Sequence, residues 1–169
     1  MRMTWNELTV SPDSVDFDDL LSDWRWLVGE EYQPVVISAL GDLFLRHDDG
    51  RILWLNTGWG QLTEVAKSAE EFKKRMVQPK CAEEWFIPNL IGDLLSSGKK
   101  LGPGECFSYQ VPPVLGGEID PDNFEPMDLS VHFSVLGQIH EQVKDLPEGA
   151  PIGEIKIREA KSPKKKKKG

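Results

Sequence analysis

Three histidines are the first residues to consider for chemistry, because imidazole is a common metal ligand and general base. His132 and His140 lie eight residues apart in an amphipathic stretch, about two turns apart on similar faces of a helix. A zinc site would need these side chains and His47 to converge with Cys106 or a carboxylate. The chain has no histidine pair at i and i+4 and no Cys-x-x-Cys pair. We therefore expect no metal and no cofactor.

Cys106 is the one candidate nucleophile, with His132 or His140 as its base. The alternative is a buried strand cysteine, which we favour because free cysteine is among the most buried residue types. The chain has no Gly-x-Ser-x-Gly elbow, and its 28 acidic residues single out no glycosidase pair. We expect no enzyme activity, no small-molecule substrate and a pair of reduced cysteines in a cytoplasmic protein.

Two glycine-rich stretches, Gly102-Pro103-Gly104 and Gly116-Gly117, resemble phosphate-binding loops at first sight. Neither is followed by Lys-Ser/Thr, and the neighbouring Glu105 and Glu118 would repel a phosphate. We interpret both stretches as turns.

The elements that position these residues centre on a β-meander between Leu40 and Ala66, with strands expected at 42–47, 51–56 and 62–66. Asp49-Gly50 predicts a two-residue hairpin with positive φ at both positions. Because apolar side chains point to both faces of the strand at 51–56, that strand should be central and covered on both sides. The next turn, residues 57–60, either presents Trp59 outward or tucks it over the sheet edge.

Helical spacing of apolar residues predicts helices over 15–27, 69–77, 82–95 and 129–146. The expected signals at their ends are Ser14 and Gly29 for the first, a Ser68–Glu71 capping box and Pro79 for the second, a possible kink at Pro88 and a stop at Gly98 for the third, and Asp128 or Ser130 as the cap of the last. Gly137, inside the last helix, indicates close backbone packing.

The fold class that follows is α+β, a single domain with a mainly antiparallel sheet packed by amphipathic helices. Short strands are also expected at 34–38 and 105–111. The expected organisation is a helical segment at 1–29, the main domain at 30–146, an extension at 147–160 with a possible edge strand at 154–157, and a lysine tail at 161–169 that is disordered in isolation.

Charge is distributed unevenly along the chain. Six lysines lie in the last nine positions, so residues 1–160 hold 14 basic and 28 acidic residues, a net charge of −14. Such a body repels nucleic acid and anionic lipid and attracts basic surfaces. The lysine tail could bind nucleic acid or lipid, fold back on the acidic body, or be an appended feature. No apolar run is long enough to cross a membrane.

Two features stand out as candidate partner-binding surfaces. Trp59 is flanked by glycines in a turn, and aromatic residues are enriched at interface hot spots, although we favour a tryptophan that caps the core. The second is an expected acidic loop that would steer a basic partner or simply keep the protein soluble; its acids are Glu118, Asp120, Asp122, Glu125 and Asp128.

The order of several motifs resembles a bacterial family, long described only as a domain of unknown function, that forms the C-terminal domain of a type VI secretion DNase-immunity protein and stands beside the SUKH-type immunity proteins. The motifs are LGDLF at 40–44, ILWLNTG at 52–58, the helix start at 68–72, LGPGECF at 101–107, PPVLGGE at 112–118 and VHFSVLGQIHEQV at 131–143. The lysine tail is not part of this pattern. The resemblance implies a cytoplasmic, non-catalytic protein that binds a toxin and blocks it.

The function expected from the sequence is therefore that of an immunity or antitoxin-like protein, which occludes a basic, nuclease-type toxin with an acidic surface and aromatic anchors. The alternative is a nucleic-acid-associated or regulatory protein that acts through its lysine tail.

Overall fold

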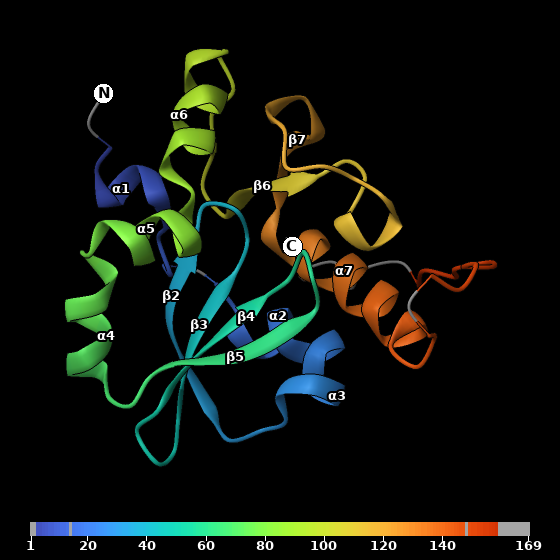
Figure 1. Ribbon diagram of the computed structural model, residues 1–169, viewed down its shortest axis with the longest axis horizontal. Coiled ribbons are helices and arrows are strands. Elements are labelled where there is room, and N and C mark those ends of the chain that lie inside the picture. The colour runs from blue at the N-terminus through green and yellow to red at the C-terminus, as the bar shows by residue number, and fades with distance from the viewer. Residues whose placement is uncertain (1–2, 14, 148, 159–169) are drawn as a thin grey trace, which may run out of the picture.

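The computed structural model describes residues 3–13, 15–147 and 149–158. The lysine tail and Ser14 lie outside these residues. The main element is a five-stranded antiparallel sheet with its strands in chain order (Figure 1). Its strands are β1 (Thr9–Val10), β2 (Tyr32–Ser38), β3 (Leu43–His47), β4 (Ile52–Asn56) and β5 (Gln61–Ala66). The predicted meander and the α+β class are confirmed.

The hairpin between β3 and β4 forms where predicted, but its turn is of another type. Phe44 pairs with Trp54, and the His47 N–H donates to the Arg51 carbonyl at 2.8 Å. Three residues therefore form the loop, and of these only Gly50 has a positive φ, at 98°. A type I turn followed by a left-handed glycine satisfies the same Asp-Gly signal, so the two-residue turn was wrong.

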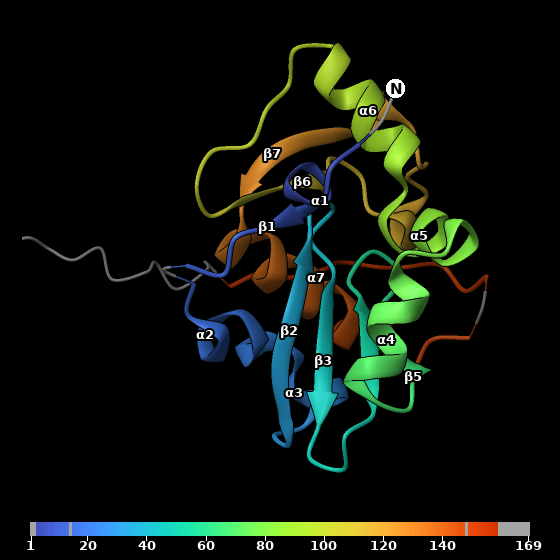
Figure 2. The ribbon, with the colours of Figure 1, turned by 90° about the vertical axis from the view of Figure 1, so that its left-hand side faces the viewer.

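Helices cover both faces of this sheet, because β4 buries apolar side chains on each side. Ile52 packs with β3's Phe44 in a core cluster beneath α4 (Ala69–Met76), α5 (Pro79–Phe86) and α6 (Pro88–Ser96). Leu55 packs in a second cluster with Trp24 and Phe133. Figures 1 and 2 show α4, α5 and α6 on one side of the sheet and α2 (Phe17–Leu21), α3 (Arg25–Val28) and α7 (Leu129–Val143) on the other.

The helix expected over 15–27 is broken into α2 (Phe17–Leu21), a 3-10 turn (Ser22–Trp24) and α3 (Arg25–Val28), and a short α1 (Trp5–Leu8) precedes them. Asp16 caps α2 by accepting from the Asp19 N–H at 3.1 Å. Trp24 is fully buried and its indole donates to the Phe133 carbonyl at 2.8 Å. This contact to a distant helix favours the tighter turn over a continuous helix. Gly29, with φ of 77°, ends α3 as predicted.

The helix expected over 82–95 is also two helices. Pro79 begins α5 instead of closing α4, and Ile87 takes φ of +45° between α5 and α6. Pro88 causes this break, because a proline lacks an N–H and disfavours helical geometry in the residue before it. Ser68 caps α4 as predicted, but the Glu71 carboxylate accepts from the Lys67 N–H and not from that of Ser68. At the end of α6 the Gly98 N–H donates to Leu95, which agrees with the predicted stop.

The strand expected at 105–111 does not join the main sheet. It forms β6 (Glu105–Tyr109) and pairs with β7 (Phe124–Asp128) in a separate two-stranded sheet. Much of the segment expected as an acidic loop is therefore a strand. Residue propensities do not predict β7, because it contains Pro126, Glu125 and Asp128, and proline and acidic residues are depleted in strands. One backbone bond, from the Phe107 N–H to the Ala39 carbonyl at 2.8 Å, links β6 to the main sheet.

The last helix, α7 (Leu129–Val143), begins with Asp128 as its cap, which accepts from the Ser130 N–H at 2.8 Å. It ends at Val143, so Leu146 lies beyond it and is exposed. No helix in the described ranges has the length and apolar character needed to cross a bilayer.

Two helical glycines allow a matched test of packing. A Cβ at Gly137 of α7 would lie 2.5 Å from the Asp23 carbonyl oxygen, whereas a Cβ at Gly92 of α6 would meet only Met3 Sδ, at 3.7 Å. We expect Gly137→Ala to destabilise the protein by about 1–3 kcal/mol through overpacking. Gly92→Ala should stabilise it by about 0.5–1 kcal/mol through helix propensity. Urea denaturation of both variants checks this, and equal effects would contradict the close approach.

Candidate functional site

The turn between β4 and β5, residues 57–60, presents Trp59 to solvent. The Gly60 N–H donates to the Asn56 carbonyl at 2.8 Å, and the Trp59 N–H donates to the Asn56 side chain at 3.1 Å. Trp59 is 52% exposed. The core-capping arrangement that we favoured from the sequence is therefore wrong, and the structure has the outward one.

Three rings hold this turn from below. His132 Nε2 lies 3.0 Å from Thr57 Oγ1, and His140 Nε2 lies 3.0 Å from the Thr57 carbonyl oxygen. The ring of Tyr109 lies so close to Gly58, and that of His140 so close to Gly60, that a Cβ at either glycine would come within 2.5 Å of the ring or its hydroxyl. The glycines are there because the rings leave no space for a side chain.

Beneath the turn, a chain of polar side chains runs through the interior. Ser108 Oγ lies 2.7 Å from His132 Nδ1, and Asp42 accepts from Thr57 N–H at 3.0 Å, from Thr57 Oγ1 at 3.1 Å and from Trp54 Nε1 at 3.1 Å. A neutral imidazole with its proton on Nε2 satisfies every group, since Ser108 then donates to Nδ1 and Nε2 donates toward Thr57 and the Gly41 carbonyl. Every buried polar side-chain atom in the described residues has a partner.

Burial shifts the pKa values of the acidic and the basic side chains beneath the turn in opposite directions. It raises the pKa of Asp42 from 3.8 to about 6, against the hydrogen bonds that Asp42 accepts. It lowers the pKa of His132 from 6.5 to about 4, and it lowers the pKa of His140 as well. At neutral pH both imidazoles are therefore uncharged.

Serine, histidine and aspartate thus meet here, but not as a catalytic relay. Thr57 stands between His132 and Asp42, and His132 and Ser108 are buried at 0% and 4% exposure. Cys106 lies in the apolar cluster beside Leu43 and Phe133, and burial raises the pKa of its thiol well above the usual range. The sequence did not predict Ser108, Thr57 and Asp42 as members of this buried polar network. The available signal was the pair of histidines, His132 and His140, two turns apart on an amphipathic helix.

The five acids predicted to bind a partner are all exposed, but several have local roles. Asp120 accepts from the Asp122 N–H at 2.9 Å, and Asp128 caps α7. Glu125 forms an ion pair with Lys99 at 3.1 Å. Glu118 and Asp122 stand on the connection between β6 and β7.

That connection, residues 110–123, is a structured loop closed by Asn123. The Asn123 side chain accepts from the Val111 N–H and donates to the carbonyls of Val111 and Glu118, each at 2.9 Å. The loop exposes three apolar side chains beside its acids; these are Val111, Leu115 and Ile119. Because Tyr109 packs on Gly58, the base of this loop adjoins the turn that carries Trp59. We call Trp59 together with residues 110–123 the Trp59 surface.

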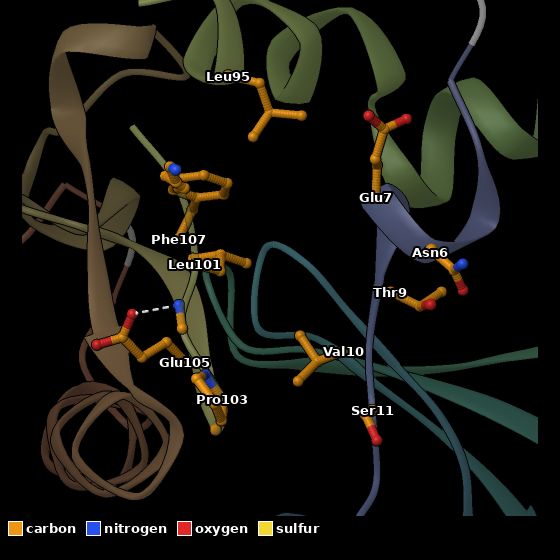
Figure 3. Close-up of a pocket in the computed structure, with 13 residues that line it drawn as sticks. Asn6, Glu7, Thr9, Val10, Ser11, Leu95, Leu101, Pro103, Glu105 and Phe107 are labelled. Atoms are coloured by element: carbon orange, nitrogen blue, oxygen red, sulfur yellow. Dashed lines mark hydrogen bonds between the residues drawn. The ribbon is translucent and has the colours of Figure 1, made fainter. Parts of the chain in front are cut away.

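A cavity of about 450 Å³ lies elsewhere, between β1 and the loop that enters β6 (Figure 3). Val10, Leu101 and Phe107 form its apolar part. Its carboxylates are engaged locally, since Glu105 accepts from the Gly102 N–H at 2.8 Å and Glu7 accepts from the Thr4 N–H at 2.9 Å. None of the residues of the buried polar chain lines this cavity. Across the described residues, no three His, Cys, Asp or Glu side chains gather as a metal would require.

The fit of the rings on the turn predicts that Gly60 tolerates no side chain. Gly60 has φ of 66° and lies against the His140 ring, whereas Gly50 has φ of 98° with open space around it. Gly50→Ala should cost about 1 kcal/mol from backbone strain alone. Gly60→Ala should cost about 1–3 kcal/mol more, because its Cβ also displaces the ring. Chemical denaturation measures both, and similar losses would argue against the clamp.

The opposed pKa shifts of Asp42 and His132 predict two pH dependences of folding stability that cancel in the native protein. Because the folded-state pKa of Asp42 is raised, its ionisation reduces stability as pH rises from about 4 to 6. Because that of His132 is lowered, its protonation reduces stability as pH falls from about 6.5 to 4. The two effects offset each other in the native protein. Asp42→Asn should leave only the histidine effect, so this variant should lose stability relative to the native chain between pH 6 and 4. Parallel stability curves would contradict this.

Comparison with known proteins identifies similarities to a protein family and to a solved structure. The model of "T6SS immunity protein Tdi1, C-terminal" matches residues 66–140, less than half of the chain. A comparison with curated proteins finds no match. Among solved structures, the crystal structure of Atu4351 from Agrobacterium tumefaciens is similar at 16% sequence identity and a TM-score of 0.49, over 72% of this chain and 63% of that chain. Residues 66–140 thus resemble the C-terminal domain of a type VI secretion immunity protein, which confirms the resemblance predicted from the motifs within that range. The motifs at 40–44 and 52–58 lie outside the matched residues.

Proposed function

We propose that this protein binds a cognate toxin of basic, nuclease type and occludes it through the Trp59 surface. The family match supports an immunity role. The observation that carries the proposal is the outward tryptophan on a turn that three rings, those of Tyr109, His132 and His140, hold in place.

A rigid, exposed tryptophan is suited to anchoring a partner. A large aromatic side chain on a fixed backbone loses little conformational freedom on binding, so more of the free energy of burial appears as affinity. Tryptophan is also among the residues most enriched at interface hot spots. The apolar side chains of Val111, Leu115 and Ile119 extend the surface that a partner would cover.

Charge supports a basic partner. Glu118, Asp120 and Asp122 are exposed on the same loop as the apolar residues, in a body whose residues 1–160 carry a net charge of −14. Negative potential of this kind accelerates association with a positive surface and disfavours acidic partners. A nuclease that binds nucleic acid must present such a positive surface.

The mechanism that follows is stoichiometric. The immunity protein covers the site at which the toxin would bind its substrate, and protection lasts as long as the complex. The groups that might do chemistry are bonded to one another in the interior, so binding energy and residence time decide the outcome.

Co-expression with the toxin encoded beside this protein tests the proposal. We expect the native chain to prevent killing, and Trp59→Ala to weaken the complex by about 2 kcal/mol, a loss of roughly 30-fold in affinity. Val77→Ala is the matched control, since Val77 is an exposed apolar residue (64%) at the end of α4, outside the Trp59 surface. Trp59→Phe should restore part of the affinity. Unchanged killing in the presence of the native chain would reject the proposed function, and full protection by Trp59→Ala would reject this surface.

A further inference from the structure

The segment that follows α7 folds back along that helix without joining either sheet. Figure 2 shows it running beside α7. Residues 154–157, expected as a possible edge strand, form no strand pair in the described part of the chain. Their neighbourhood is instead held by two glutamine side chains of α7, Gln138 and Gln142.

Each glutamine binds the backbone of one residue as a neighbouring β-strand would. The Gln142 amide donates to the Lys156 carbonyl at 2.7 Å and accepts from the Lys156 N–H at 3.0 Å. The Gln138 amide donates to the Arg158 carbonyl at 3.2 Å and accepts from the Arg158 N–H at 2.7 Å.

The spacing explains why this works. Residues four apart on a helix are separated by about 6 Å along its axis. Alternate residues of an extended chain are separated by about 6.6 Å. Two glutamines at i and i+4 therefore match the backbone groups of residues j and j+2 in an extended peptide, whatever the side chains of that peptide are.

A third element selects one side chain. The Arg158 guanidinium pairs with Asp23, whose other carboxylate oxygen accepts from Ser134 Oγ at 2.7 Å. Ser134 Oγ in turn accepts from the Gln138 amide at 3.0 Å. The side chain of Asp23 is 17% exposed and Gln138 is 6% exposed, so this is a formed site and not a chance surface contact. It binds an arginine by its backbone and its side chain together.

The segment that fills this site is held by little else. Ile157 is 42% exposed and the Arg158 side chain is 66% exposed. Four backbone hydrogen bonds and the exposed Arg158–Asp23 ion pair, opposed by the entropy of ordering the segment, leave a small free energy of docking. Such a segment opens far more often than the core unfolds.

We propose that Asp23, Ser134, Gln138 and Gln142 form a docking site for an extended, arginine-containing segment of the toxin, and that residues 156–158 occupy this site until the toxin displaces them. The identity of the partner as a toxin rests on the proposed function. The chemistry of the segment, extended and basic, follows from the contacts of Lys156 and Arg158.

A peptide in trans tests the site without any toxin. The full-length double variant Lys156→Pro, Arg158→Pro removes both N–H donors and the guanidinium, and so opens the site. A labelled peptide with the sequence of residues 152–158 should bind this variant about tenfold more tightly than the native chain, in which the internal segment competes. The matched control is Ile155→Pro, Ile157→Pro, which alters the two residues whose N–H groups make none of these bonds, and it should behave like the native chain. Fluorescence anisotropy measures each affinity.

Further variants in the opened background decide whether the peptide uses the proposed groups. Gln142→Ala should weaken peptide binding at least fivefold, while Glu141→Ala, its exposed neighbour on α7, should leave it unchanged. A peptide with glutamine in place of arginine should also bind more weakly. Equal binding to the native and opened chains, or binding indifferent to Gln142 and to the arginine, would overturn the docking site. Because the peptide assay contains no toxin, such a result would leave the proposed immunity function intact. Unimpeded killing on co-expression would instead reject the toxin as the partner and would not affect the evidence for a peptide-docking site.

Discussion

The need to satisfy every buried polar group at Thr57 is the constraint on which the rest of this structure depends. Thr57 directly follows β4 and is buried inside the protein, where its N–H, hydroxyl and carbonyl all require partners. Asp42, His132 and His140 supply them; Asp42 directly precedes β3, and the two histidines lie on α7. One threonine therefore fixes the main sheet, the last helix and, through Ser108, the second sheet relative to one another.

This arrangement gives residue types that are often catalytic a structural role in the interior. The imidazole of His132 is bonded on both nitrogens, the carboxylate of Asp42 accepts three hydrogen bonds, and each is shielded from water. Groups so fully engaged have no free position for a substrate, and what they provide is rigidity. The rigidity reaches the surface at Trp59, the one residue of the turn that is left exposed.

Helix α7 serves two purposes on two of its faces. His132 and His140 face the turn that carries Trp59, while Gln138 and Gln142 face the segment at 154–158. Gly137 lies between these faces and lets the helix pack against the backbone carbonyl of Asp23. The side-chain carboxylate of Asp23 is thereby placed beside Arg158. The helix that stabilises one proposed contact surface therefore also builds the other.

The sequence by itself determined the features that depend on neighbouring residues. The meander, the start of α7 at Asp128, the helix ends at Gly29 and Gly98 and the glycine-flanked turn of Trp59 all follow from local propensity and spacing. The resemblance to an immunity protein family was also predictable, because the order of motifs is a property of the sequence. Tertiary structure alone decided the separate β6–β7 sheet, the break at Ser22–Trp24, the rings under Trp59 and the pairing of Asp23 with Arg158, 135 positions apart. These depend on contacts between residues distant in sequence, which local patterns of hydrophobicity and propensity do not encode.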